Sequence, residues 1–158
     1  MNSLFIFALA PVFAWIWIRL ASQGREPTSP AKFAFGLVFV GLGFAILIIP
    51  ARLAEQGGQV SPMWLIATYF LHTVGELTLS PVGLSAMTTL APARIAGLMM
   101  GVWFLATSVG NFIGGRVAGF YESWPLPSLF TAVAGFAIGA GLILFALVPS
   151  MRKLLPKK

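Results

Sequence analysis

The chain has 158 residues, of which 58% are hydrophobic and 9% charged, and its formal net charge is +6 at pH 7. Soluble domains carry about 25% charged residues, so this composition excludes an ordinary soluble domain and predicts an integral membrane protein. The chain contains no cysteine, which excludes a disulfide framework and any metal site or nucleophile built on cysteine. Its basic residues form no long run in the middle of the chain, which favours a membrane surface over nucleic acid as the partner.

Five apolar segments follow one another, each close to the roughly 20 residues that cross a bilayer as a helix. In chain order they cover residues 2–20, 32–51, 62–88, 93–120 and 126–150. These runs are too long for strands and lack a period of two. The sequence therefore predicts an all-α integral membrane fold with five transmembrane helices.

The first segment has one competing interpretation, a secretory signal peptide with its apolar region at residues 4–18. No basic residue precedes that region, and four further apolar segments follow it. A signal peptide has a positively charged start, so a first membrane span is the better interpretation.

Lysine and arginine lie mostly on one side of the predicted bundle. One side carries Arg52 and Arg116, and the other carries eight basic residues: Arg19, Arg25, Lys32, Arg94, Arg152, Lys153, Lys157 and Lys158. The positive-inside rule then places the N-terminus of this chain outside and its C-terminus in the cytoplasm. An external N-terminus and an odd number of helices predict that the chain is a fragment of a longer protein.

The third segment contains Glu76, one of only four acidic residues. A carboxylate at the bilayer centre costs about 3 kcal/mol on insertion scales. We therefore expect Glu76 to face a water-filled cavity, pair with a cation or be protonated; a protonated glutamate joining two helices is the structural alternative. His72 and Ser80 lie one turn to either side of it, and His72 is a candidate proton relay, although a hydrogen bond to a neighbouring helix would explain it equally well.

Pro81 lies inside this segment and removes a backbone hydrogen bond. Together with Gly75 and Gly83, it predicts a hinge below Glu76, because irregular backbone at membrane depth is tolerated where it lines a cavity. A passive kink that improves packing is the alternative.

The fourth segment contains a GxxxG pattern at Gly97 and Gly101, which is typical of close helix packing. Trp103 lies too deep for an interfacial belt, and its indole N–H needs a partner. It either forms the wall of a cavity, which we favour, or fills a helix interface. Asn111 is expected to form hydrogen bonds between helices.

Enzymatic motifs are missing from the chain. It has no HExxH, no P-loop, no pair of intramembrane carboxylates, and one histidine with no aspartate or cysteine. These residues provide neither a metal site nor a hydrolytic dyad. We therefore expect no enzyme activity and no cofactor.

One stretch of the sequence, HTVGELTLSPVGLSAMTTLAPARIAGLMMGVWFLATSVGN at residues 72–111, resembles the tenth and eleventh helices of the proton-dependent oligopeptide transporter family, within the major facilitator superfamily. NSLFIFALAPVFAWIW at residues 2–17 resembles the eighth helix of that family, and KFAFGLVFVGLGF at residues 32–44 its ninth. The resemblance implies a fold of two six-helix bundles, of which this chain would supply core helices eight to twelve of the C-terminal bundle.

The resemblance also implies roles for individual residues. Glu76 matches the glutamate that receives the α-amino group of the peptide, and Ser80 matches a pocket neighbour one turn on. Trp103 matches a tryptophan that lines the peptide side-chain pocket. Asn2 matches an asparagine that hydrogen-bonds the peptide, but Ser3 follows it where family members often have proline.

The resemblance implies a function: the C-terminal part of a symporter for di- and tripeptides in the bacterial inner membrane, driven by a proton gradient. The family's ExxER-type motif, the basic residues for the peptide carboxylate and the seventh helix do not occur in this sequence. Because alternating access needs two bundles, we expect no transport without the N-terminal bundle. The alternatives are a major facilitator protein for another small solute, and a membrane scaffold or truncated remnant that transports nothing.

Overall fold

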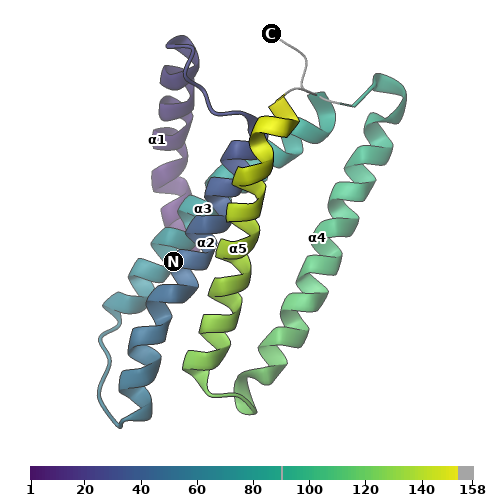
Figure 1. The fold of residues 1–158 in the computed structure, drawn as a ribbon. Helices are drawn as coiled ribbons and strands as arrows, with labels where there is room; N and C mark the ends of the chain where they lie inside the picture. Colours follow the sequence, from purple (N-terminus) through teal and green to yellow (C-terminus); the bar gives the residue numbers. More distant parts are fainter. Residues whose placement is uncertain (90, 153–158) are drawn as a thin grey trace.

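The computed structural model describes residues 1–89 and 91–152. Five long helices make up most of the molecule: α1 (Asn2–Ser22), α2 (Ser29–Glu55), α3 (Met63–Thr89), α4 (Ala96–Ala118) and α5 (Leu126–Arg152), as Figure 1 shows. Two short 3₁₀ turns, η1 (Ala93–Ile95) and η2 (Gly119–Glu122), flank α4. The predicted all-α fold is confirmed. Lys153, Lys157 and Lys158, which enter the charge count, lie outside the described residues.

Three helices, α1, α2 and α5, extend beyond the predicted apolar segments into their polar flanks, whereas α4 is shorter than predicted because 3₁₀ turns form at both of its ends. α2 begins at Ser29, before the predicted start at Lys32, because Thr28 stands at its N-cap and Pro30 occupies its first turn. Proline is favoured there, since its missing N–H would have no partner in the helix. Hydropathy marks the part of a helix that lies in lipid, so it misses polar end turns.

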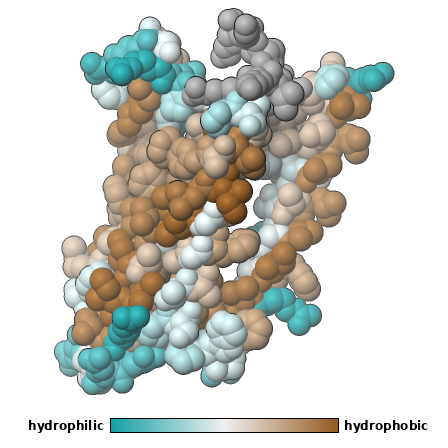
Figure 2. Space-filling model, in the orientation of Figure 1, coloured by the Kyte–Doolittle hydropathy of each residue, from teal (hydrophilic) through white to brown (hydrophobic). Residues whose placement is uncertain are grey.

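Within the described residues, four segments are long and apolar enough to cross a membrane: Asn2–Ser22, Ser29–Glu55, Ala93–Glu122 and Leu126–Met151. α3 is less apolar because His72, Glu76 and several threonines interrupt it. Four of the five expected spans, in α1, α2, α4 and α5, are thus apolar enough to cross a membrane, and the remaining helix, α3, is more polar. Figure 2 shows a hydrophobic surface across the middle of the molecule and hydrophilic surface at its two ends, as a bilayer requires.

α2 lies between α3 and α5 and packs closely against both. Small residues make these approaches possible: a Cβ added at Gly36 would lie 2.9 Å from the Gly75 carbonyl oxygen of α3. On the other face, a Cβ added at Gly141 of α5 would lie 3.1 Å from the carbonyl oxygen of Ala34, which is fully buried. Close backbone contact at small residues is the usual way in which membrane helices associate.

α1 and α4 lie at the edges of this three-helix core, and each packs against α3. α4 stands apart from α5 along most of its length (Figure 1). Near the η2 turn, a groove of about 960 Å³ separates the two helices. α3 is therefore the helix through which α1 and α4 join the core.

The connection between α1 and α2 carries the one ion pair among the described residues. The Lys32 ammonium lies 2.6 Å from a Glu26 carboxylate oxygen and 4.3 Å from the centroid of the Trp17 ring. Lys32 is only 7% exposed, so both contacts compensate for removing its charge from water. They hold the end of α1 against the start of α2.

Candidate functional site

The structure brings Glu76, in the middle of α3, together with Asn2 in the first turn of α1. The Asn2 side-chain amide Nδ2 donates a hydrogen bond of 3.0 Å to Glu76 Oε2. Glu76 is exposed, whereas Asn2 is half-buried. Two of the residues expected to bind substrate therefore lie in direct contact, although 74 positions separate them in the sequence.

Thr73 extends this contact into the bundle, and it is not among the site residues expected from the sequence. Its hydroxyl Oγ1 lies 2.6 Å from Asn2 Oδ1 and 2.7 Å from the Tyr69 carbonyl oxygen. Thr73 is fully buried, with 0% of its surface exposed. The sequence contained a signal, because residues three apart on a helix share a face, so Thr73 belongs beside Glu76.

His72 points against α2. Its ring lies 4.7 Å from the Phe44 ring, and a Cβ added at Gly43 would lie 2.5 Å from His72 Nε2. Nε2 is buried and has no hydrogen-bond partner among the described residues. Ser80, by contrast, is exposed one turn after Glu76. The proton relay through His72 therefore remains a prediction, and the structure places its ring in the α2–α3 interface.

Trp103 lies in the interface between α4 and α3. The sequence left two interpretations open for it, the wall of a cavity and the filling of a helix interface. Its ring lies over Gly83, where an added Cβ would come within 2.5 Å of Cζ3, and it meets the Phe33 ring at 90° with centroids 6.1 Å apart. The indole is half-buried, so one part packs and another stays accessible. The assignment to a substrate pocket is not tested by this packing.

The predicted hinge lies in a continuous helix, since α3 runs from Met63 to Thr89 through Pro81. Gly75 permits the approach of α2, because a Cβ added there would lie 2.7 Å from a methyl group of Val40. Gly83 likewise permits the close approach of the Trp103 ring of α4. Both glycines thus have a packing function, and movement about Pro81 remains a prediction.

The GxxxG glycines of α4 do not pack against another helix in the described part of the chain. Cβ atoms added at Gly97 or Gly101 would have nothing within 4 Å, and the same holds for Gly110, Gly114 and Gly115. Asn111 is exposed on the same helix. These glycine positions of α4 are therefore open, in contrast to the glycines of α2.

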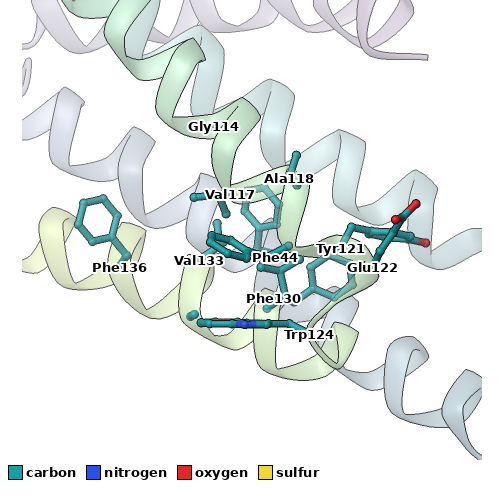
Figure 3. Close-up of a pocket in the computed structure, with 14 residues that line it drawn as sticks. Phe44, Gly114, Val117, Ala118, Tyr121, Glu122, Trp124, Phe130, Val133 and Phe136 are labelled. Carbon is teal, nitrogen blue, oxygen red and sulfur yellow. The ribbon is translucent and has the colours of Figure 1, made fainter.

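The groove between α4 and α5 is separate from the Glu76 site. Figure 3 shows Phe44, Val117, Phe130 and Val133 grouped within it, with Tyr121 and Glu122 together at one end. Its lining is mostly apolar and aromatic. In residues 1–89 and 91–152, no three His, Asp or Glu side chains come together as metal ligands would. Side-chain hydrogen bonds join α1 to α3 at the Glu76 site instead.

A family model, described as the POT family, matches residues 1–132. The chain belongs to the POT family. The resemblance found in the sequence is thereby confirmed, and with it the major facilitator fold.

Relatives of this POT family chain include the peptide transporter YePEPT of Yersinia enterocolitica, which is 40% identical over 98% of this chain and 31% of its own length. The dipeptide and tripeptide permease A of Escherichia coli K12 is 40% identical over 75% of this chain and 23% of its own length. A crystal structure of a peptide transporter POT in complex with sulfate superposes with a TM-score of 0.87 and 44% identity, over 99% of this chain and 31% of that one. This POT family chain therefore spans less than a third of the proteins that it matches.

Proposed function

We propose that this chain forms the C-terminal part of the substrate cavity of a proton-coupled transporter for di- and tripeptides. The observation that carries the proposal is the environment of Glu76. It is exposed, lies in the middle of a helix and accepts a hydrogen bond from the neutral amide of Asn2. A neutral donor leaves the negative charge of a carboxylate uncompensated, so the site suits a cationic ligand group.

No cation in residues 1–89 and 91–152 pairs with this carboxylate. The ion pair of the described residues joins Lys32 to Glu26, so no cation in that part of the chain lies within 4.0 Å of Glu76. The α-ammonium group of a peptide has three donors and one positive charge, which a carboxylate and nearby neutral acceptors can satisfy. Relatives described as a peptide transporter and as a dipeptide and tripeptide permease support this ligand class.

We assign the other expected site residues to the same cavity. Ser80 presents a hydroxyl one turn from Glu76, and Asn2 presents its amide from α1. Trp103 of α4 lies over Gly83, which follows Glu76 by two turns of α3, and part of its indole is accessible. We assign the peptide ammonium to Glu76, its neighbouring polar atoms to Asn2 and Ser80, and a peptide side chain to Trp103.

Transport itself would require the rest of such a protein, because alternating access moves two bundles about a central site. A proton gradient would drive uptake, and Glu76 is the candidate group that exchanges protons in this chain. The structural alternative is a protonated glutamate that joins α1 to α3 through Asn2. The two hypotheses differ in whether removing the charge affects peptide uptake.

The experiment is a chimera in which this chain replaces the matching segment of the Yersinia peptide transporter. Proton-driven dipeptide uptake into proteoliposomes is measured for the chimera and for its Glu76→Gln form. Loss of a charge-assisted hydrogen bond should lower uptake at least about tenfold. Glu122→Gln, in η2, which contacts α4 and α5 but not α1, is the matched control and should transport normally. Normal uptake by Glu76→Gln, with both variants inserted equally, would disprove the role of Glu76.

A further inference from the structure

Thr73, Asn2 and Glu76 form a chain of hydrogen bonds from the buried side of α3 to its exposed side. Asn2 Nδ2 lies 3.0 Å from Glu76 Oε2, and Asn2 Oδ1 lies 2.6 Å from Thr73 Oγ1. The Thr73 hydroxyl also lies 2.7 Å from the Tyr69 carbonyl oxygen. The single amide of Asn2 thus connects a buried hydroxyl to an exposed carboxylate.

The number of donors limits how this chain can be arranged. A threonine hydroxyl has one proton to donate and two lone pairs to accept with. Both neighbours of Thr73 Oγ1, Asn2 Oδ1 and the Tyr69 carbonyl oxygen, are acceptors in this arrangement. The hydroxyl can therefore donate fully to only one of them at a time.

With Glu76 ionised, one arrangement satisfies all three side chains, and it is the one in the structure. The carboxylate can only accept, so the NH₂ group of Asn2 faces it. The carbonyl oxygen of Asn2 then faces Thr73, whose hydroxyl proton turns toward it. The Tyr69 carbonyl keeps its helical hydrogen bond and loses only the additional one.

With Glu76 protonated, a second arrangement is complete. The acid O–H donates to Asn2 Oδ1 after the amide has rotated by half a turn. Asn2 Nδ2 then donates to Thr73 Oγ1, and the Thr73 hydroxyl donates to the Tyr69 carbonyl. The NH₂ and C=O ends of an amide are nearly equal in size, so the rotation needs no movement of α1 or α3.

We propose that Thr73 is a positioning residue that makes the orientation of the Asn2 amide follow the protonation of Glu76. On deprotonation, the proton of Glu76 passes to water at its exposed side, the amide rotates, and the hydroxyl proton of Thr73 turns from Tyr69 to Asn2. Proton release is thereby coupled to rotation of the amide. The inference rests on the proposed function, in which Glu76 is the group that exchanges protons.

Other ionisable groups lie further from this chain of hydrogen bonds. On α3, His72 is turned against α2, and Tyr69 lies two turns before Glu76. The elements packed against α3 carry the Met1 α-amino group and Arg19 on α1, Lys32, Arg52 and Glu55 on α2, and Arg116 on α4. Apart from the amino group next to Asn2, these charges lie in the end turns of their helices. The Met1 amino group is therefore the one that the experiment must control for.

The sequence offers a direct measurement, because Asn2 and Asn111 are its two asparagines. The full chain is labelled with ¹⁵N-asparagine and ¹³C-glutamate, placed in lipid nanodiscs and titrated by NMR between about pH 4 and pH 9. We expect the side-chain ¹⁵N signal of Asn2 to move in one step, with the same midpoint as the Glu76 carboxyl signal. The exposed Asn111 should not move. The ¹⁵N signal that disappears in Asn2→Gln is assigned to Asn2, and the ¹³C signal that disappears in Glu76→Gln is assigned to Glu76.

The variants separate positioning from structure. Thr73→Val keeps the shape of the side chain but removes its hydroxyl. It should reduce the pH-dependent change of the Asn2 side-chain ¹⁵N signal at least twofold, whereas Thr73→Ser should retain that change. Thr73→Ala makes the same comparison if valine lowers the helical circular dichroism. An Asn2 signal that stays constant while Glu76 titrates would overturn the inference. So would an undiminished step in a folded Thr73→Val or Thr73→Ala chain, or a Glu76 that does not titrate.

A chain extended at its N-terminus, which converts the Met1 amine into an amide, should show the same step. Loss of the step there would attribute it to the amine and overturn the inference. The outcome is independent of transport. A coupled Asn2 step together with normal uptake by the Glu76→Gln chimera would disprove the proposed function and leave the positioning role intact.

Discussion

The ring of Trp103 in α4 occupies the space above Gly83 in α3 where any side chain would stand. α4 contacts α3 and makes no comparable contact with α5 in the described residues. The fit of Trp103 over Gly83 is therefore one of the contacts that hold α4 against α3.

Gly83→Ala should weaken this docking. The new methyl group would overlap the Trp103 ring and lie 2.6 Å from Phe33 Cζ, and such overpacking typically costs about 1–3 kcal/mol. The free energy of unfolding in mixed detergent micelles is the measurement. Gly101→Ala is the matched control, because nothing lies within 4 Å of a Cβ there; it should be neutral or stabilising by up to about 1 kcal/mol. Equal effects of the two substitutions would contradict the assigned interface.

Gly43→Ala should destabilise the chain through a collision with the His72 ring. A second substitution, His72→Ala, removes that ring and makes room for the methyl group. The double variant should then be more stable than the sum of the single changes predicts, with a coupling of about 1 kcal/mol or more. Additive free energies would show that His72 does not occupy the α2–α3 interface.

Lys32→Met should loosen the connection between α1 and α2. The substitution keeps the aliphatic stem but removes the 2.6 Å contact with Glu26 and the cation–π contact with Trp17. We expect a loss of about 2 kcal/mol in the free energy of unfolding. Arg25→Met, at an exposed position of the same loop, should change it by less than about 0.5 kcal/mol. A similar small effect at Lys32 would mean that its contacts contribute little.

Trp103→Ala should alter which peptides are taken up by the Yersinia chimera. Loss of the indole enlarges the space beside Gly83, so dipeptides with large side chains should gain relative to those with small ones. One methylene group more or less in a hydrophobic pocket changes the discrimination between two substrates by about 10-fold or more. A several-fold change in the uptake ratio of two competing dipeptides is therefore measurable. An unchanged preference with lowered stability would assign Trp103 to packing alone.

The outcome at Glu76 illustrates what can be inferred from one position. Its isolation among apolar residues was sufficient to predict that it faces a water-filled cavity, pairs with a cation or is protonated, because the energy of a carboxylate in lipid is a property of that residue and its depth. The contacts of Asn2 with Glu76 and with Thr73 could not be predicted, because both depend on how α1 lies against α3.

The sequence by itself determined the five helices, the membrane environment and the family, because these follow from the hydrophobicity of each segment and from motifs read in order along one chain. Only the tertiary structure decided that His72 turns into α2, that Trp103 fills the space over Gly83, and that the glycines of α2 and α3 pack while those of α4 are open. In lipid, apolar surface does not distinguish one helix from another. Contacts between small side chains and between polar atoms therefore determine which helices pack together. These contacts join residues of different helices, so they form only in the tertiary structure.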